Sequence, residues 1–188
     1  MSNLVPIMSV SLTGILSDLD RVLLDASAIQ ARVAAMADEV QRDFAGKLIT
    51  VIAIMDGGLF FVADLLRGID LPMRLITMGA SSYHGTTTSS GEVKFQWPAT
   101  LNLQGQHVLL LDDILDTGLT LGALQDRLKQ EGAATIKTGV LLKKRREHVR
   151  EVQADYVGFE IADEFVVGYG MDYQGRFRNL PCIGILKP

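Results

Sequence analysis

The stretch from residue 107 to residue 121, HVLLLDDILDTGLTL, decides the fold class of this chain. Its first half is an unbroken apolar run of strand length, as expected for a strand buried on both faces of a sheet. Its second half carries three aspartates and a Thr-Gly-Leu-Thr turn, and the residues beyond it have apolar side chains at helical spacing. A buried strand that turns directly into a helix is typical of a parallel sheet covered by helices.

The segments on either side continue this alternation of strands and helices. The predicted helices cover residues 25–45, 59–69 and 120–132. The predicted strands cover residues 48–55, 73–80, 107–113 and 135–144, with two shorter strands at 154–161 and 165–170. We therefore predict an α/β fold, with a mainly parallel twisted sheet flanked by helices and a small lobe formed by the chain ends.

Two of the predicted helices have recognisable ends. The first begins at a cap, either Asp25 or Ser27, and the last stops at Gly132. Apolar residues at helical spacing mark the sides of these helices that face the core. They are Ile29, Val33, Met36 and Val40 in the first helix, and Leu121, Leu124 and Leu128 in the last.

Bulk composition limits the class of protein. A chain of 188 residues can build one substantial core, so we expect a single domain over residues 1–188. The net charge of -4 and the pI of about 5.3 argue against a broad nucleic-acid-binding surface. The single cysteine, Cys182, excludes an internal disulfide and suits a reducing compartment. Because it lies in an apolar run, we expect it to be a small buried side chain.

The N-terminal residues argue against export. They are apolar but carry no positive charge before Arg21, whereas a secretory signal begins with positive charge. No stretch approaches the roughly 18 uncharged apolar residues of a membrane-spanning helix. We expect a cytoplasmic protein without membrane contact.

The turn after the central strand has the features of a phosphate site. Gly118 allows a tight turn, and the backbone amides around it lie at the start of a helix, where an anion is favoured. Thr117 and Thr120 add hydroxyl donors. The turn is not a Walker phosphate loop, because the order of glycines and lysine that defines that loop is absent.

The aspartates ahead of this turn need another ligand, because carboxylates repel phosphate. Asp112 and Asp113 can accept hydrogen bonds from a cis-diol, or lie near a Mg²⁺ that bridges sugar and phosphate. The whole loop is therefore interpreted as a ribose 5-phosphate site. The acidic pair alone is not specific, since response-regulator receiver domains and phosphohydrolases also carry acids at a strand end.

The nine residues from Asp112 to Thr120 resemble the phosphoribosyl-diphosphate signature of type I phosphoribosyltransferases. Three more segments are similar, in order, to those of the hypoxanthine-guanine members of this family. VIAIMDGGLFFVADLL resembles their pyrophosphate loop, SSYHGTTTSSGEV their flexible catalytic loop, and ADYVGFEIADEFVVGYGMDYQGRFRNLP their base-binding segment. The resemblance covers roughly residues 23–186. It implies the type I fold, with a flexible lid at about 79–93 and a hood from the N-terminal segment and about 155–188.

For the signature loop, the resemblance implies that Asp112 and Asp113 contact the ribose hydroxyls and the metal. The family often has Glu at the first position, so the shorter Asp112 would reach the diol through water or metal. Asp116 is implied as the general base that accepts the proton of purine N7. A loop cap that bonds nearby amides is the alternative role for Asp116. The 5-phosphate would bind at Thr117, Gly118, Leu119 and Thr120.

The resemblance also implies a purine subsite. Lys144 would donate to purine O6, Phe165 would stack on the ring, and the backbone of Val166 would contact the base edge. Without the resemblance, Lys144 is a solvated charge in a basic run, and Phe165 and Val166 are core strand residues.

On the side of the phosphoribosyl donor, the resemblance implies a Mg²⁺ ligand at Asp172 and a pyrophosphate contact at Arg178. A simple turn acid is the alternative for Asp172. Ser82 and Tyr83 match the Ser-Tyr pair of the lid, which excludes water while an oxocarbenium-like state forms. A surface loop without a role is the alternative for this segment.

One position departs from the family. The pyrophosphate loop often carries Lys or Arg where this chain has Asp56, and a carboxylate beside pyrophosphate is unfavourable. The amides of Gly57 and Gly58 remain able to bind pyrophosphate. We expect Asp56 to weaken the affinity for the donor.

The resemblance implies a purine-salvage enzyme. It would transfer the phosphoribosyl group of phosphoribosyl diphosphate to N9 of hypoxanthine or guanine with Mg²⁺, giving IMP or GMP and pyrophosphate. A homodimer or homotetramer is expected. The alternative is a regulatory nucleic-acid-binding protein on the same fold, for which KKRREHVR at 143–150 is the only basic cluster. A receiver domain would need its acidic pair earlier, and a metal-dependent hydrolase would need grouped histidines.

Overall fold

The computed structural model describes residues 13–81, 94–95 and 101–187. These residues form two β-sheets and the helices that pack on the larger one. The predicted α/β class is confirmed. Most of the expected lid at about 79–93 lies outside the described residues.

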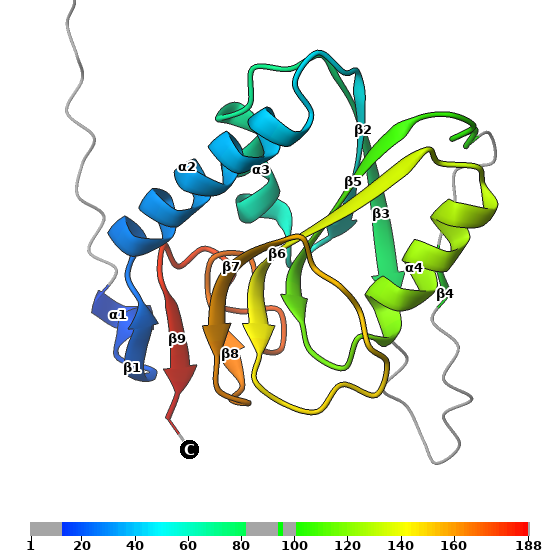
Figure 1. Cartoon of the computed structure of the whole chain (residues 1–188). Helices are drawn as coiled ribbons and strands as arrows, with labels where there is room; N and C mark the ends of the chain where they lie inside the picture. Colours follow the sequence, from blue (N-terminus) through cyan, green and yellow to red (C-terminus); the bar gives the residue numbers. More distant parts are fainter. Residues whose placement is uncertain (1–12, 82–93, 96–100, 188) are drawn as a thin grey trace, which may run out of the picture.

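The larger sheet has six strands in the order β4-β3-β2-β5-β6-β7 (Figure 1). They are β2 (Ile49–Met55), β3 (Met73–Ser81), β4 (Lys94–Phe95), β5 (His107–Leu115), β6 (Thr135–Lys144) and β7 (Tyr156–Ile161). Every pairing in this sheet is parallel except that of β4 with β3. Because parallel strands point the same way, the carboxyl ends of β2, β5 and β6 meet at one edge, where open α/β sheets bind their ligands.

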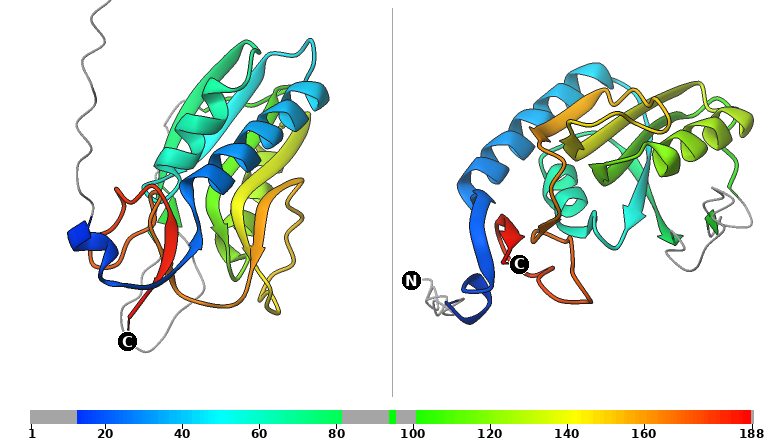
Figure 2. Two further views of the ribbon diagram at one scale, coloured as in Figure 1. Left: turned by 90° about the vertical axis from the view of Figure 1, so that its left-hand side faces the viewer. Right: turned by 90° about the horizontal axis from the view of Figure 1, so that it is seen from below.

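Helices cover both faces of this sheet, as the view from below in Figure 2 shows. They are α2 (Ala26–Asp43) and α3 (Leu59–Arg67) on one face and α4 (Leu119–Gln130) on the other. Side chains alternate along β2: Val51 and Ala53 pack with α2 and α3, whereas Ile52 and Ile54 pack with α4. This double burial is why β2 is apolar except for Thr50, which is itself buried.

The predicted helix ends are found in the structure. Asp25 is the cap of α2, because its carboxylate accepts the N–H of Ala28 at 2.8 Å. Ser27 donates its hydroxyl to the same carboxylate at 2.5 Å. Gly132 follows the last turn of α4 with a φ of 81°, a left-handed conformation that ends the helix. The predicted core positions of both helices are at most 3% exposed.

The chain ends form a second, antiparallel sheet in the order β1-β9-β8, which lies below α2 in Figure 1. Its elements are β1 (Leu19–Leu24), β8 (Val166–Val167) and β9 (Ile183–Leu186), preceded by the short helix α1 (Thr13–Leu16). The small lobe was predicted, but β1 and β9 were not. The strand predicted at 165–170 is shorter, because the chain turns at Gly168, whose φ is 101°.

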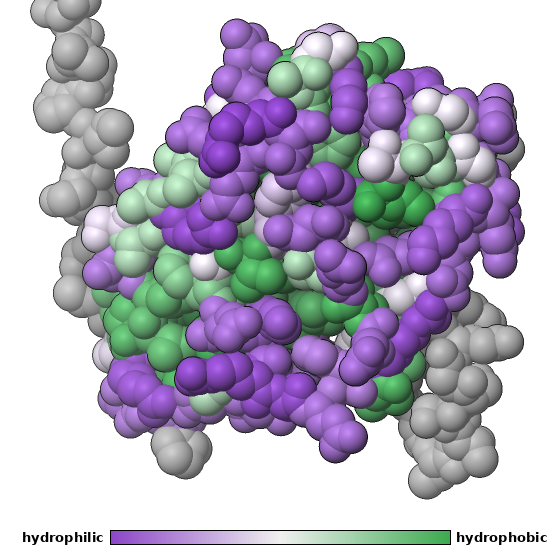
Figure 3. Space-filling view, viewed as in Figure 1, coloured by the Kyte–Doolittle hydropathy of each residue, from purple (hydrophilic) through white to green (hydrophobic). Residues whose placement is uncertain are grey.

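Figure 3 shows the molecule from the same side as Figure 1, and the surface on this side is uneven in polarity. Hydrophilic residues form its lower edge, and hydrophobic residues gather over the second sheet. On β1, Val22 is 49% exposed, whereas Cys182, just before β9, is buried as predicted. None of the described helices has the length and apolar character to cross a lipid bilayer.

Candidate active site

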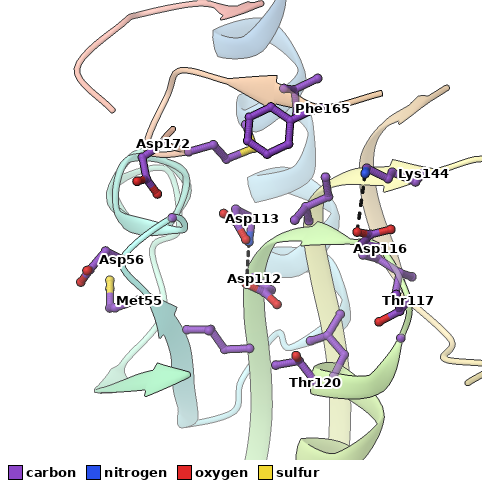
Figure 4. Close-up of a pocket in the computed structure, with 18 of the residues that line it drawn as sticks. Met55, Asp56, Asp112, Asp113, Asp116, Thr117, Thr120, Lys144, Phe165 and Asp172 are labelled. Carbon is purple, nitrogen blue, oxygen red and sulfur yellow. Dashed lines mark hydrogen bonds and ion pairs between the residues drawn. The ribbon is translucent and has the colours of Figure 1, made fainter. Parts of the chain in front are cut away.

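A cavity of about 480 Å³ opens where β2, β5 and β6 end and the second sheet approaches them. Residues from all four of these segments line it, and Figure 4 shows them facing one another. The cavity brings together thirteen of the predicted site residues: Asp56, Gly57, Asp112, Asp113, Asp116, Thr117, Gly118, Thr120, Lys144, Phe165, Val166, Asp172 and Arg178. Leu119 lies within the phosphate turn as the first residue of α4, and Ser82 and Tyr83 lie outside the described residues.

The turn between β5 and α4 is built as an anion site. Gly118 is the N-cap of α4, has a φ of 80°, and offers no side chain to cap the helix. The N–H of Leu119 makes a long contact of 3.5 Å to the Thr117 hydroxyl, and the helix dipole at this end favours a negative charge. A Cβ atom at Gly118 would lie 2.0 Å from the carbonyl oxygen of Arg150, so glycine is required twice at this position, by conformation and by space.

Asp112, which is buried, and Asp113, which is partly buried, form an acidic pair near the end of β5. Asp112 is 6% exposed and accepts the backbone N–H of Asp113 at 2.9 Å. Burial, followed by the adjacent charge of Asp113, raises the pKa of Asp112 well above its usual value. Burial also raises the pKa of Asp113. The pair therefore carries unfavourable charge that a cation or sugar hydroxyls would stabilise.

The turn after β2 lies directly against this pair. A Cβ atom at Gly57 would lie 1.8 Å from Oδ2 of Asp113, so only glycine leaves room for that carboxylate. On the other side, a Cβ atom at Gly170 would lie 2.1 Å from the carbonyl oxygen of Gly57. The backbone of Gly57 is thus packed between the main sheet and the segment after β8. The peptide bond before Asp56 is cis.

Asp116 belongs to a ring of alternating charges on the other side of the cavity. The Nζ of Lys144 lies 3.5 Å from Asp116 Oδ2 and 3.1 Å from Asp163 Oδ1. Arg146 bridges the same two acids, with its guanidinium 3.0 Å from Asp116 Oδ1 and 3.2 Å from Asp163 Oδ2. Only 12% of the Lys144 side chain is exposed, so the alternative of a solvated lysine is wrong. The carboxylate of Asp116 pairs with cations, which differs from the alternative of an amide-bonding loop cap.

Sequence reasoning missed three residues of this region: Arg146, His148 and Asp163. Arg146 and His148 lie in the segment between β6 and β7, and His148 Nδ1 lies 2.6 Å from the backbone oxygen of Asp116. The basic run at 143–150 was the available signal, but apart from Lys144 its residues were considered only as a nucleic-acid contact. Four of its five lysines and arginines are instead paired within the protein: Lys143 with Glu160, Lys144 and Arg146 with Asp116 and Asp163, and Arg150 with Asp126.

An aromatic side chain lies across the cavity from Lys144 (Figure 4). Phe165 is 58% exposed although it directly precedes β8, and its ring meets that of Tyr173 edge-on with centroids 5.7 Å apart. The alternative of a core position is therefore wrong for Phe165 and right for Val166, which is 6% exposed. The ring of Phe165 contacts Tyr173 on one side and is exposed at the cavity, so a flat ligand can stack on it.

Arg178 joins the acids on the side of the cavity opposite Asp116. Its guanidinium lies 2.9 Å from Asp172 Oδ1, 4.0 Å from Asp56 Oδ2, and donates to the backbone oxygen of Gly170 at 2.7 Å. Asp172 also accepts the N–H of Gly175 at 2.8 Å, so it is a turn acid as well as a cavity residue. The side chain of Asp56 is 79% exposed and borders the cavity.

The arrangement fits a divalent cation that binds together with its substrate. Within residues 13–81, 94–95 and 101–187, no three His, Cys, Asp or Glu side chains are grouped as a metal site. Mg²⁺ commonly takes one or two protein carboxylates and completes its shell with water and substrate phosphates. The ionised forms of Asp112 and Asp113, disfavoured by burial, would be stabilised by such an ion.

Known proteins share this chain's sequence and fold. A family model described as a phosphoribosyl transferase domain matches residues 22–174. The hypoxanthine-guanine phosphoribosyltransferase of Streptococcus pneumoniae is 41% identical over 91% of this chain and 95% of that protein. The enzyme of the same name from Bacillus subtilis is 40% identical over 91% of this chain and 95% of its own.

Solved structures that are similar to this chain also include hypoxanthine phosphoribosyltransferases. A hypoxanthine phosphoribosyltransferase from Staphylococcus aureus matches with a TM-score of 0.89 and 36% identity, covering 95% of this chain and 97% of that one. A mutant of the Trypanosoma cruzi enzyme, in a ternary complex with substrates, matches with a TM-score of 0.84 and 33% identity, over 92% and 97% of the two chains. With the cavity lined as described above, these similarities mean that the chain belongs to the hypoxanthine-guanine phosphoribosyltransferase family.

Proposed function

We propose that this protein transfers the 5-phosphoribosyl group of phosphoribosyl diphosphate to N9 of hypoxanthine or guanine. The products are IMP or GMP and pyrophosphate, and the pathway role is purine salvage. The observation that carries the proposal is the division of the cavity. The exposed ring of Phe165 and the largely buried Lys144 face each other across the cavity, and the start of α4 and the acidic pair complete its lining.

Asp116 is proposed as the general base. As N9 of the purine attacks the anomeric carbon, the bond from that carbon to the pyrophosphate oxygen breaks and the N7 proton becomes acidic. A carboxylate within reach of N7 then accepts that proton. The place of Asp116 between the phosphate turn and Lys144 supports this role.

Lys144 is proposed to select the purine. An ammonium group donates hydrogen bonds and accepts none, so it favours a 6-oxo purine over a 6-amino purine. Phe165 would stack on the base, and the backbone of Val166 would bind its edge. The low exposure of Lys144 strengthens such a bond, because a charged hydrogen bond gains when water is excluded.

The donor would lie along the acidic side of the cavity. The 5-phosphate would bind the amides and hydroxyls of residues 117–120, including Leu119, and the ribose diol would bind Asp112 and Asp113. Asp112, Asp113 and Asp172 are the residues that would hold Mg²⁺, whose charge would stabilise the departing pyrophosphate. Gly57 and Arg178 would bind pyrophosphate.

Further proposals concern the rest of the chain. We propose one domain over residues 1–188, a cytoplasmic location, and a homodimer or homotetramer. The lid with Ser82 and Tyr83 would exclude water during transfer. A structural relative from Trypanosoma cruzi was studied for the effect of its C-terminal region on oligomeric state and enzymatic activity. The oligomeric state of this protein should therefore be measured together with its activity.

The test is an assay with phosphoribosyl diphosphate, Mg²⁺ and one base at a time: hypoxanthine, guanine, xanthine and adenine. Nucleotide and pyrophosphate are measured separately and should form in equal amounts. Activity with hypoxanthine or guanine and none with adenine is expected. Nucleotide formation from adenine alone, or none from any base, would refute the proposal. If the protein shows no activity and instead retards RNA or DNA in an electrophoretic mobility-shift assay, the regulatory alternative would be favoured.

A further inference from the structure

Arg146 occupies an unusual position relative to the proposed general base. Its guanidinium touches Asp116 Oδ1 at 3.0 Å, whereas Lys144 approaches the other oxygen, Oδ2, at 3.5 Å. The two cations thus approach different oxygens of one carboxylate. The cation at Oδ1 determines which oxygen remains for a ligand.

Lys144 and Arg146 differ in what else they are proposed to bind. The Lys144 ammonium contacts both Asp116 and Asp163 and has a third N–H donor, which is proposed to bind purine O6. Arg146 contacts the same two acids and can keep both of them paired if Lys144 shifts toward the base. Arg146 is therefore the cation whose contact with Asp116 does not compete with binding of the purine.

Arg146 does not reach the substrate. Of the described residues, those lining the cavity include Asp116 and Lys144 but not Arg146, which approaches from a neighbouring pocket. Its side chain is 34% exposed, so water reaches it from outside the cavity. A role for Arg146 in the reaction therefore acts through the acids that it contacts, Asp116 and Asp163, of which Asp116 is the proposed base.

The backbone at Asp116 is held by the same segment. His148 Nδ1 lies 2.6 Å from the carbonyl oxygen of Asp116, and the backbone N–H of Arg150 donates to the carbonyl oxygen of Thr117 at 3.1 Å. Alternate residues of the segment 146–150 thus hold the side chain of Asp116, its carbonyl and the next peptide. The contact from Arg146 is part of a regular support behind the loop.

We infer that Arg146 is a positioning residue for the proposed reaction: it binds Oδ1 of Asp116, so that Oδ2 faces the purine and accepts the N7 proton. In this step the N7–H bond breaks, the Oδ2–H bond forms, and the electron pair stays on the purine as N9 bonds to the anomeric carbon. The inference rests on the proposed function. It adds a residue to which the family resemblance assigned no role.

The test compares R146Q, R146K and R145Q with the wild-type protein. R145Q is the matched control, because Arg145 is the exposed arginine next in sequence and the structure assigns it no ion pair with Asp116. Single-turnover experiments, with the protein in excess over a limiting amount of donor and with saturating base, measure the transfer step without product release. Urea unfolding checks that each variant is folded, which we expect because partly exposed ion pairs add little stability.

R146Q should slow transfer about 10-fold or more, since a general base contributes about 10²–10⁴-fold and a misdirected one loses part of this. The KM for phosphoribosyl diphosphate should stay within about twofold, because Arg146 does not line the donor site. R146K should recover most of the lost rate, and R145Q should match the wild type.

Three results would overturn the inference while wild-type activity is intact. One is transfer by R146Q at the wild-type rate, and another is an equal loss in R145Q. The third is a slow R146Q that R146K does not relieve. An inactive wild-type protein would instead refute the proposed function, so the two failures are distinguishable.

Discussion

Replacing Gly57 with alanine tests the contact between the turn after β2 and the acidic pair. The added Cβ would lie 1.8 Å from Asp113 Oδ2 and 2.8 Å from its Cγ. Ordinary contact begins at 3.4 Å, so the carboxylate or the turn must move by about 1.6 Å. The φ of Gly57 is outside the left-handed region, so the backbone itself tolerates alanine and the clash is the whole effect.

Two losses follow from this displacement. Overpacking should lower the free energy of unfolding by about 1–3 kcal/mol. Moving Asp113, which is proposed to bind the donor, by more than 1 Å should lower kcat/KM for phosphoribosyl diphosphate by about 100-fold, equivalent to about 2.7 kcal/mol. Urea unfolding and initial rates at varied donor concentration measure the two quantities. G14A is the control, because the Cβ it would add meets no atom within 4 Å outside its own helix and chain neighbours.

A double-mutant cycle makes the test specific. All the nearest atoms that the new Cβ would meet belong to the carboxyl group of Asp113, so D113A removes the clash. In the D113A background, G57A should change the free energy of unfolding by less than about 0.5 kcal/mol. An equal cost of G57A in both backgrounds would refute the steric argument.

Four further substitutions have expected outcomes. D116N should lower kcat by about 100-fold or more with little change in the donor KM, and a near-normal kcat would refute the base assignment. K144A should weaken hypoxanthine and guanine binding by about 10- to 100-fold in direct binding experiments, and unchanged affinity would refute that contact. D56N should lower the donor KM about two- to fivefold at low ionic strength and less at high salt, and no change would mean that this carboxylate does not act on the donor. D112N should raise the free energy of unfolding at neutral pH, because burial and the charge of Asp113 raise the pKa of Asp112 in the folded state. Ionised Asp112 then lowers stability at any pH above its unfolded pKa of about 3.9, and the stabilisation by D112N should vanish as the pH falls to that value.

The main sheet and its helices were predictable because their signals are local. The cores of β2 and β5 are buried on both faces, which gives the apolar runs at 51–55 and 108–111, and α2 and α4 bury one face each, which gives helical spacing. Their ends were predictable from Asp25 and Gly132, whose side chain and backbone freedom act within a few residues.

The second sheet was not predictable in the same way. β1 is largely exposed, so its sequence lacks a buried face, and its pairing with β9 joins residues from opposite ends of the chain. Such a strand depends on tertiary context more than on its own sequence. The charge ring around Asp116 was missed for a similar reason: Arg146 and Asp163 come together only when β6 and β7 pair in parallel.

The central place of β9 in the second sheet sets an order of assembly during synthesis. β9 pairs with β1 on one side and is the hydrogen-bonded neighbour of β8 on the other, yet it is made last. A nascent chain can complete the parallel sheet, and with it the phosphate turn, once residue 161 has emerged from the ribosome. The side of the cavity that carries Phe165 can form only after residues 183–186 have been synthesised, because β8 pairs with β9. Translation thus forms the half of the cavity proposed for the donor before the half proposed for the base, and a chain stopped before residue 183 would lack the partner strand of β8.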